Sequence, residues 1–246
     1  MLERFADGVW VDAGPVSFLG LKLNATMTVL EVNGGVLVVA PLPLTPERRA
    51  AVNALGPVAH LYAPNTFHHL WLGDWSREFP HAQVHAPAAL AAKRPDLRID
   101  RPHDEAPSPF GDVLDEVPIR GFRLVETALV HRPTGTAIVT DLVHNIGRPT
   151  HTWTKVYTKL MGFYDRVALS RVLRWTSFDD RGAARESVDR LLALPFEHLI
   201  VGHGTPLVAH GHELLASALR FLPAASRPKL PAPAQKPPLF SAKPCG

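Results

Sequence analysis

Apolar residues in this chain form short runs with the spacing of strands, separated by stretches with the spacing of helices. β-Branched runs at residues 27–32 and 35–40 flank Asn33-Gly34, a pair that favours a tight hairpin turn. Further apolar runs of strand length predict strands at 58–63, 82–85, 113–119, 123–131, 136–140 and 198–201. The chain is therefore expected to be rich in strands from end to end.

Helices are expected between these strands. Pro46 suits the first turn of a helix, and Asp180 suits a helix cap. Helical segments are predicted at 47–52, 67–79, just after Pro87, and at 152–175, 180–194 and 208–222, with a loop at 95–112. Strand-rich halves that each end in helices predict one α/β domain over residues 1–222, a four-layer αββα sandwich of two mixed sheets. The proline-rich remainder, 223–246, is expected to be a disordered tail.

Composition limits the class of protein. The 246 residues are 46% apolar with a formal charge of +3, and part of the basic surplus lies in the tail, so nucleic acid is not expected as a partner. Cys245 is the single cysteine, which predicts a reducing compartment without disulfides. No signal segment or membrane-length apolar run is seen, so a cytoplasmic protein without stable membrane insertion is expected.

Potential metal ligands follow three of the predicted strands. His68 and His69 come after the strand at 58–63, Asp141 follows the strand at 136–140, and His203 follows the last strand, within Gly202-His203-Gly204. Imidazole and carboxylate groups from separate strand ends are typical of divalent metal sites in α/β proteins. Three imidazoles and one carboxylate suit zinc in tetrahedral geometry, and iron or manganese with added water.

The order of these motifs resembles the metallo-β-lactamase superfamily, which includes glyoxalase II-like thioester hydrolases. The likeness extends over roughly residues 5–220. The stretch from Ala63 to Trp75, with Thr140-Asp141-Leu142 and Gly202-His203-Gly204, is similar to an uncharacterised branch known as a domain of unknown function. The resemblance implies the four-layer fold and a metal-dependent hydrolase.

The chain departs from the superfamily's first motif, His-x-His-x-Asp-His. With His69 as its last residue, the two leading histidines fall on Pro64 and Thr66 and the aspartate falls on His68. A further family histidine falls in residues 123–127, which contain none. The resemblance therefore implies that one of two metal positions is lost. It implies that the other position is kept, as a mononuclear site of His68, His69, Asp141 and His203 for one divalent metal ion.

The resemblance implies hydrolysis of an ester, thioester, lactone or phosphoester by one metal-bound hydroxide. Asp141 is the candidate that binds metal and orients the water, and His144 is the candidate general acid or oxyanion donor. His144 could equally be an ordinary surface histidine or one that supports a metal ligand. Glu126 could replace the lost histidine but is more often a solvated strand position. Asn65 could orient a substrate, although a turn residue is the simpler interpretation.

Two other functions compete with the hydrolase. The fold could serve as a non-catalytic binding module, or a histidine-rich mononuclear site could bind iron and act as an oxidoreductase. A small-molecule substrate is expected in the catalytic cases. The aromatic segment 152–175 could line an apolar pocket, form a homodimer surface or touch a membrane, and a packed lid is the interpretation we favour.

Overall fold

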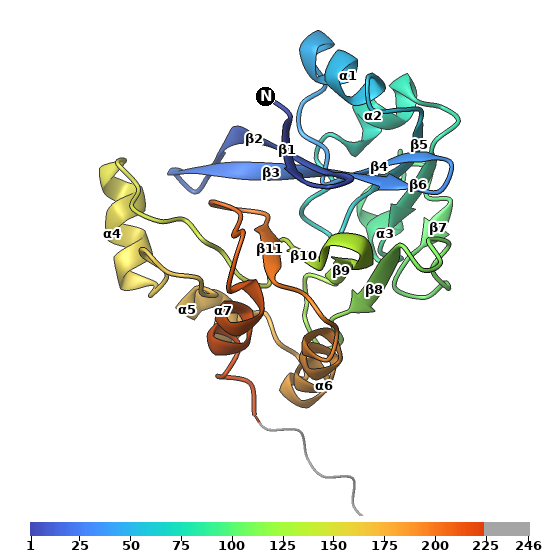
Figure 1. Ribbon diagram of the computed structural model, residues 1–246. Helices are drawn as coiled ribbons and strands as arrows, with labels where there is room; N and C mark the ends of the chain where they lie inside the picture. Colours follow the sequence, from blue (N-terminus) through green and yellow to red (C-terminus); the bar gives the residue numbers. More distant parts are fainter. Residues whose placement is uncertain (224–246) are drawn as a thin grey trace, which may run out of the picture.

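Two mixed β-sheets pack face to face, with helices on both outer surfaces (Figure 1). The computed structural model describes residues 1–223. This arrangement confirms the predicted αββα sandwich. The proposed tail at 223–246 lies, apart from Pro223, outside the described residues, and the domain limits at 1–222 stay a prediction.

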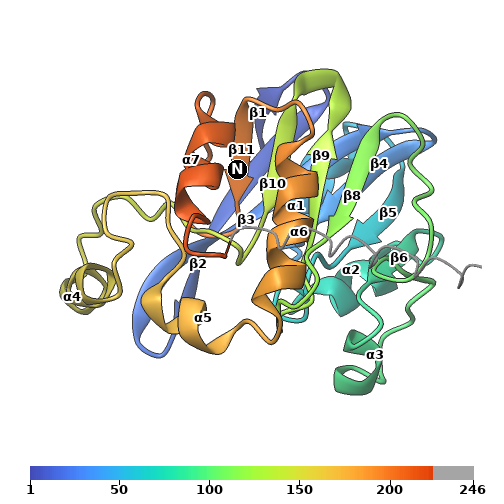
Figure 2. The ribbon, with the colours of Figure 1, turned by 90° about the horizontal axis from the view of Figure 1, so that it is seen from below.

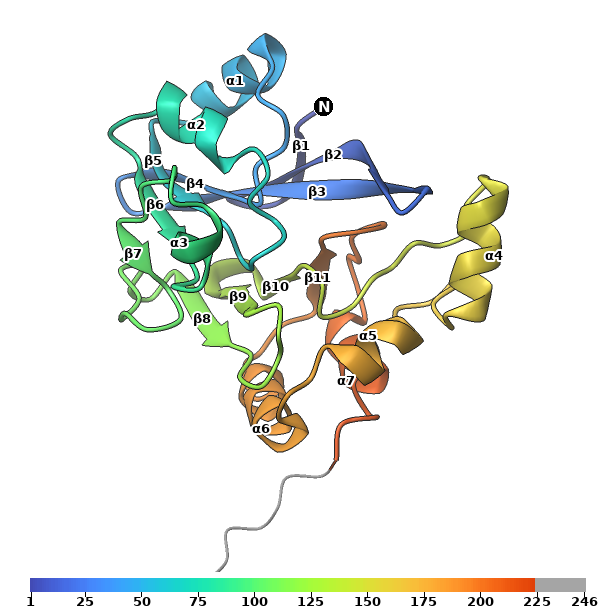
Figure 3. The ribbon, with the colours of Figure 1, turned by 180° about the vertical axis from the view of Figure 1, so that it is seen from behind.

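The first sheet contains seven strands in chain order. Its first four strands are antiparallel and its last four are parallel, with β4 belonging to both sets. The longest pair, β2 with β3, extends past the rest of the sheet toward α4 (Figure 3). The strands are β1 (Glu3–Ala6), β2 (Val9–Phe18), β3 (Leu21–Val32), β4 (Gly35–Val39), β5 (Val58–Tyr62), β6 (Gln83–Ala86) and β7 (Arg101–Pro102).

The second sheet has four strands in the order β11-β10-β9-β8. Strands β10 and β11 are parallel, and β8, β9 and β10 are antiparallel neighbours. The strands are β8 (Leu114–Pro118), β9 (Thr127–His131), β10 (Thr136–Val139) and β11 (His198–Val201). Because β10 and β11 run in the same direction, the residues that follow them emerge at the same edge of the sheet.

Helices cover the two outer faces. The first sheet carries α1 and α2, and the second sheet carries α6 and α7 (Figures 1 and 2). The helices are α1 (Pro46–Asn53), α2 (Leu72–Glu78), α3 (Leu90–Lys93), α4 (Thr152–Leu160), α5 (Arg171–Thr176), α6 (Arg181–Leu192) and α7 (Gly211–Ala218), with a 3₁₀ turn at Arg132–Thr134. Within residues 1–223, none of these helices has the length and apolar character needed to cross a bilayer.

Three layers of apolar side chains hold the sandwich together. In β11, Leu199 and Val201 pack toward α6 and α7, whereas Ile200 packs between the sheets. This alternation follows from the two-residue period of a strand. Leu37 and Leu129, one from each sheet, share the central layer with Ile200. The two sheets are therefore joined by an apolar layer, which fixes their strand ends relative to one another.

Several elements differ from the sequence predictions. Strands β1 and β2 were not predicted, because Gly14 and Pro15 interrupt the apolar pattern of residues 9–18. Pro15 is tolerated because β1 pairs only with the first part of β2, leaving Pro15 on a free edge. The helix expected from residue 67 begins at Leu72, and the helical region at 152–175 is two short helices.

A chain of largely buried polar groups runs across strands β5, β6 and β7 of the first sheet and reaches β8 of the second sheet. Arg101 forms an ion pair with Glu116 at 2.7 Å and places another N–H 3.3 Å from His85 Nδ1. The His85 Nε2 atom lies 3.0 Å from His60 Nδ1. Tyr62 donates its hydroxyl to Glu116 at 2.7 Å. Burial and the nearby charges of His60 and Arg101 lower the pKa of His85 to about 3, so this imidazole is neutral in the folded protein.

The neutral His85 makes the fold sensitive to acid. The unfolded chain binds a proton at His85 below pH ~6.5, whereas the folded chain does not until about pH 3. Stability is therefore fully present above pH ~6.5 and falls as the pH drops, by about 1.4 kcal/mol per pH unit for this group. Urea unfolding between pH 7.5 and 4.5 should show a shallower loss in His85→Gln than in wild type; equal slopes would contradict this assignment.

Candidate metal centre

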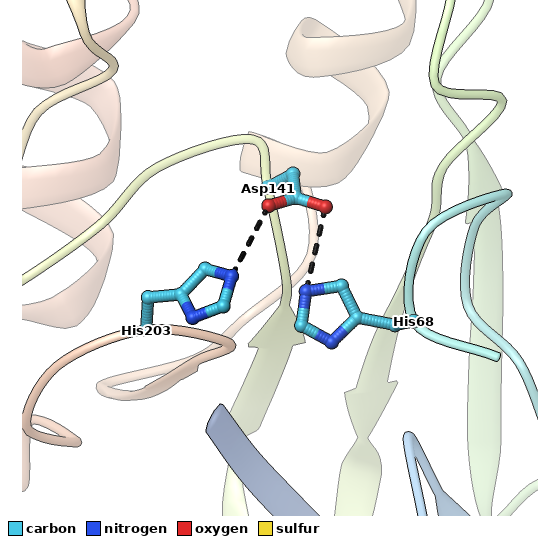
Figure 4. Close-up of side chains that lie close together, drawn as sticks. All are labelled: His68, Asp141 and His203. Carbon is cyan, nitrogen blue, oxygen red and sulfur yellow. Dashed lines mark ion pairs between the residues drawn. The ribbon is translucent and has the colours of Figure 1, made fainter. Parts of the chain in front are cut away.

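Three strand ends meet at one edge of the sandwich and bring His68, Asp141 and His203 together. Asp141 follows β10 and His203 follows β11, which are parallel neighbours. His68 comes from the opposite sheet, in the turn between β5 and α2. Figure 4 shows both imidazole rings pointing at the carboxylate of Asp141. This is the convergence that the strand-end pattern predicted.

The side chains are spaced as ligands of one ion. His68 Nε2 lies 3.4 Å from Asp141 Oδ2, and His203 Nε2 lies 3.6 Å from Asp141 Oδ1. Ligand atoms from all three residues lie within 4.8 Å of one another. Charge-assisted N–H···O bonds are usually about 2.7–2.9 Å long, so these contacts are longer than direct hydrogen bonds. These three side chains could hold a metal ion.

The protonation state of His203 supports this interpretation. Its Nδ1 lies 2.7 Å from the backbone carbonyl oxygen of Asn24. A carbonyl oxygen can only accept, so Nδ1 carries the proton and the Nε2 lone pair of the neutral ring faces Asp141. Two lone-pair acceptors that face one another repel unless a positive charge lies between them. Either a proton or a metal cation can supply that charge.

The pKa shifts at Asp141 and His203 have the same origin. Burial by itself would raise the pKa of Asp141, but the close imidazoles of His68 and His203 bring that pKa well below its usual value. Burial would lower the pKa of His203, but the close carboxylate of Asp141 raises it above the ordinary value. The site therefore contains a firmly ionised carboxylate that attracts positive charge.

Asn65 connects two of the ligands. Its Oδ1 accepts hydrogen bonds from the backbone N–H groups of Phe67 and His68, both at 2.8 Å. Its Nδ2 donates to Asp141 Oδ2, also at 2.8 Å. The side chain thus forms the turn that was the simpler prediction, and it also positions the Asp141 carboxylate. The turn role could be read from Pro64-Asn65, whereas the contact with Asp141 depends on tertiary structure.

Glu126 supports Asp141 from behind. Its two oxygens accept from the backbone N–H groups of Thr140 and Asp141, at 2.8 and 2.7 Å. The side chain is buried, and burial together with the charge of Asp141 raises its pKa. With both oxygens occupied by backbone donors, Glu126 is neither the replacement ligand nor the solvated residue considered from the sequence. It fixes the backbone that presents Asp141.

The two glycines of Gly202-His203-Gly204 allow the last strand end to approach the others. A Cβ atom at Gly202 would lie 2.8 Å from Thr140 Cα and 3.0 Å from the His68 ring. At Gly204, with φ of +110°, a Cβ atom would lie 1.9 Å from the carbonyl oxygen of Asn145. The glycines therefore have a steric purpose: they let His203 reach Asp141.

His69 is placed apart from this cluster. Its Nδ1 lies 3.2 Å from Arg94 Nη1, and burial with the charges of Lys93 and Arg94 lowers its pKa to about 4. Among the described residues, its buried Nε2 has no hydrogen-bond partner. The structure thus brings together three of the four predicted ligands, because the turn after Asn65 directs adjacent side chains to different sides.

His144 lies beside the cluster. Its ring centroid is 5.5 Å from that of His203, and burial with the neighbouring histidines lowers its pKa to about 4. Its Nδ1 is buried and has no hydrogen-bond partner within residues 1–223. Its predicted role in proton transfer or oxyanion binding stays a prediction, and its position makes either role sterically feasible.

A cavity of about 500 Å³ opens onto these residues. Its lining includes all three clustered side chains and His144, together with apolar residues from the β2–β3 hairpin, the turn before α2 and the segment around α4 and α5. The segment 152–175 therefore does contribute to a pocket wall, as one of its predicted roles required. The volume is in the usual range for small-molecule sites.

Comparison with known proteins gives a family and a fold. The family model described as "Domain of unknown function (DUF4336)" matches residues 6–167. No curated protein matches the sequence. Solved structures of metallo-β-lactamases are similar over most of the chain: one from Pontibacter korlensis has a TM-score of 0.61 at 12% identity, covering 90% of this chain and 98% of that one.

Two further structures agree. The metallo-β-lactamase FIM-1 from Pseudomonas aeruginosa, in a mono-zinc form, has a TM-score of 0.59 at 13% identity and covers 89% of this chain and 94% of that one. A metallo-β-lactamase from Erythrobacter litoralis has a TM-score of 0.61 at 14% identity, covering 90% and 96%. At these identities the likeness establishes the fold.

The steric role of Gly202 can be tested by Gly202→Ala. The added methyl group would collide with the backbone of Thr140, which cannot move without displacing Asp141. Overpacking of this kind costs about 1–3 kcal/mol, and urea unfolding should show a loss of that size. Gly182→Ala is the matched control, because there the methyl group meets only Asp180 Oδ1 at 3.3 Å. If Gly202→Ala were as stable as this control, the close-approach argument would be wrong.

Proposed function

The chain belongs to the DUF4336 family and has the metallo-β-lactamase fold, and we propose that it is a metal-dependent hydrolase with one metal ion. The observation that carries the proposal is the convergence of His68, Asp141 and His203, whose ligand atoms lie within 4.8 Å of one another. The cavity above them supplies room for a small-molecule substrate.

The donor set fits a divalent ion such as zinc. His68 and His203 would bind through Nε2 and Asp141 through a carboxylate oxygen, and three protein ligands are typical of catalytic zinc sites that keep a position for water or substrate. The backbone carbonyl of Asn24 holds His203 in the tautomer that metal binding needs. The mono-zinc form of the structurally similar FIM-1 supports a single ion in this fold. Iron and manganese accept the same ligands.

A metal ion bound there would polarise a substrate oxygen and lower the pKa of a bound water to ~7. The protein's own groups then have separate tasks. Asp141, held through its backbone by Glu126, can orient the attacking water with its second oxygen. His144, in the wall of the same cavity, can donate a hydrogen bond to the oxygen that gains charge. In ester hydrolysis water adds to the acyl carbon, the bond to the leaving oxygen breaks, and an acid and an alcohol result.

Metal content distinguishes the three-residue cluster from the four-residue set. After incubation with zinc and removal of free ions, wild type should retain about one zinc per chain, and His203→Ala should lose it. His69→Ala is the matched control and should retain zinc, because His69 faces Arg94. Zinc should also raise the melting temperature of wild type and of His69→Ala only, since a ligand that binds the folded state stabilises it.

Either of two results would overturn this assignment. Loss of zinc in His69→Ala would restore the four-ligand site, and full zinc content in His203→Ala would place the metal elsewhere.

The hydrolase itself is tested by assaying the zinc-loaded protein and Asp141→Asn on ester, thioester, lactone and phosphoester substrates. Absence of turnover in a zinc-replete protein would favour the binding-module alternative.

A further inference from the structure

The cavity over the metal centre has an apolar wall built from three separate parts of the chain. Leu21 and Leu23 come from β3, Phe67 and Leu70 from the turn before α2, and Phe163 and Leu173 from the segment around α5. Hydrogen bonds from Lys22 N to Thr154 Oγ1 and from Trp153 to Leu19 O bring α4 against the β2–β3 hairpin (Figure 3). The wall is thus a built feature that depends on long-range contacts.

The charge of the lining is as informative as its apolar character. Asp141 is the one acidic residue among the described residues that line the cavity, and lysine and arginine are absent from that lining. The arginines of the adjoining segment are turned to other partners. Arg171 donates to Leu160 O, Arg166 donates to Gly162 O, and Arg174 lies over the ring of Phe221. An anionic substrate would therefore find no lysine or arginine side chain of residues 1–223 in the cavity.

We propose that this cavity binds the apolar acyl chain of an uncharged carboxylic ester, with the ester group at the metal centre. The inference rests on the proposed function, because the reacting group is assigned from the metal site. It also narrows the range of substrates. A phosphoester or a charged acyl group would place a charge against apolar side chains, and a short acyl group would leave part of the apolar wall uncovered. The cavity would recognise the acyl chain by burial of apolar surface, which favours long acyl chains over short ones.

The mouth of the cavity has the same character. Phe67, Leu70 and Val172 line the cavity and are 50%, 58% and 41% exposed. Large apolar side chains gathered in one exposed patch usually mark a binding surface. Because these three residues line the cavity and are also exposed, they present apolar surface to the solvent beside the cavity.

Binding can be measured without catalysis by using ketones, which cannot be hydrolysed. The 2-alkanones from 2-pentanone to 2-undecanone would be titrated calorimetrically into the full chain and into His203→Ala. The dissociation constant should fall up to about fourfold for each added methylene until the cavity is filled. The fall should be equal in both proteins, because binding of the alkyl chain does not need the metal. Decanoate, which carries a charge, should bind His203→Ala at least tenfold more weakly than 2-undecanone.

Two surface variants test the location. Leu70→Glu places a charge in the wall at a position exposed enough to tolerate it, and it should abolish the dependence on chain length. Val208→Glu is the matched control: Val208 is 68% exposed and lies outside the cavity lining, and its carbonyl oxygen contacts His198 at the start of β11, the strand end away from His203. This variant should behave as wild type. A chain-length dependence that survives Leu70→Glu would overturn the assignment.

A parallel series separates this inference from the proposed function. The rate constant kcat/KM of the zinc-loaded protein would be measured on p-nitrophenyl esters from acetate to decanoate, and it should rise with chain length. Ketone binding that depends on chain length, without turnover of any ester, would support binding of the acyl chain in the cavity and refute the hydrolase. Turnover at equal kcat/KM for all chain lengths, with ketone affinities independent of length, would support the hydrolase and refute binding of the acyl chain in the cavity.

Discussion

The site depends on the need of one buried carboxylate for positive charge. Asp141 faces the Nε2 atoms of His68 and His203 across 3.4 and 3.6 Å, and the hydrogen bond from His203 Nδ1 to Asn24 O leaves the Nε2 lone pair of the neutral ring toward Asp141. Electron pairs can converge in this way only around a proton or a cation. Much of the surrounding structure maintains this convergence: Glu126 holds the backbone of Asp141, and Asn65 holds its carboxylate.

Maintaining the convergence costs stability that the fold must supply elsewhere. Glu126 is buried next to a second carboxylate, which raises its pKa, and His144 has a buried nitrogen without a partner in the described chain. Unfavourable groups of this kind are expected to gather at functional sites. The apolar layer between the sheets, which includes Leu37, Leu129 and Ile200, supplies the rigidity that keeps these groups in place.

The strand ends could be predicted from the sequence, because strand patterns and turn residues are local properties. This was enough to predict the αββα fold and to bring His68, Asp141 and His203 together. The orientation of adjacent His68 and His69 could not be predicted, since it is set by the turn that Asn65 forms. The part of the cavity wall that the β2–β3 hairpin forms could not be predicted either, because β2 was missed where Gly14 and Pro15 interrupt its pattern.

The central claim is that a single divalent ion binds among His68, Asp141 and His203. Crystals of the zinc-loaded protein, with diffraction data collected on either side of the zinc absorption edge, test it most directly. The account predicts one anomalous peak per chain, in contact with the Nε2 atoms of His68 and His203 and with the carboxylate of Asp141, and no peak at His69. A peak that includes His69, two adjacent peaks, or an empty cluster in crystals grown with excess zinc would contradict it.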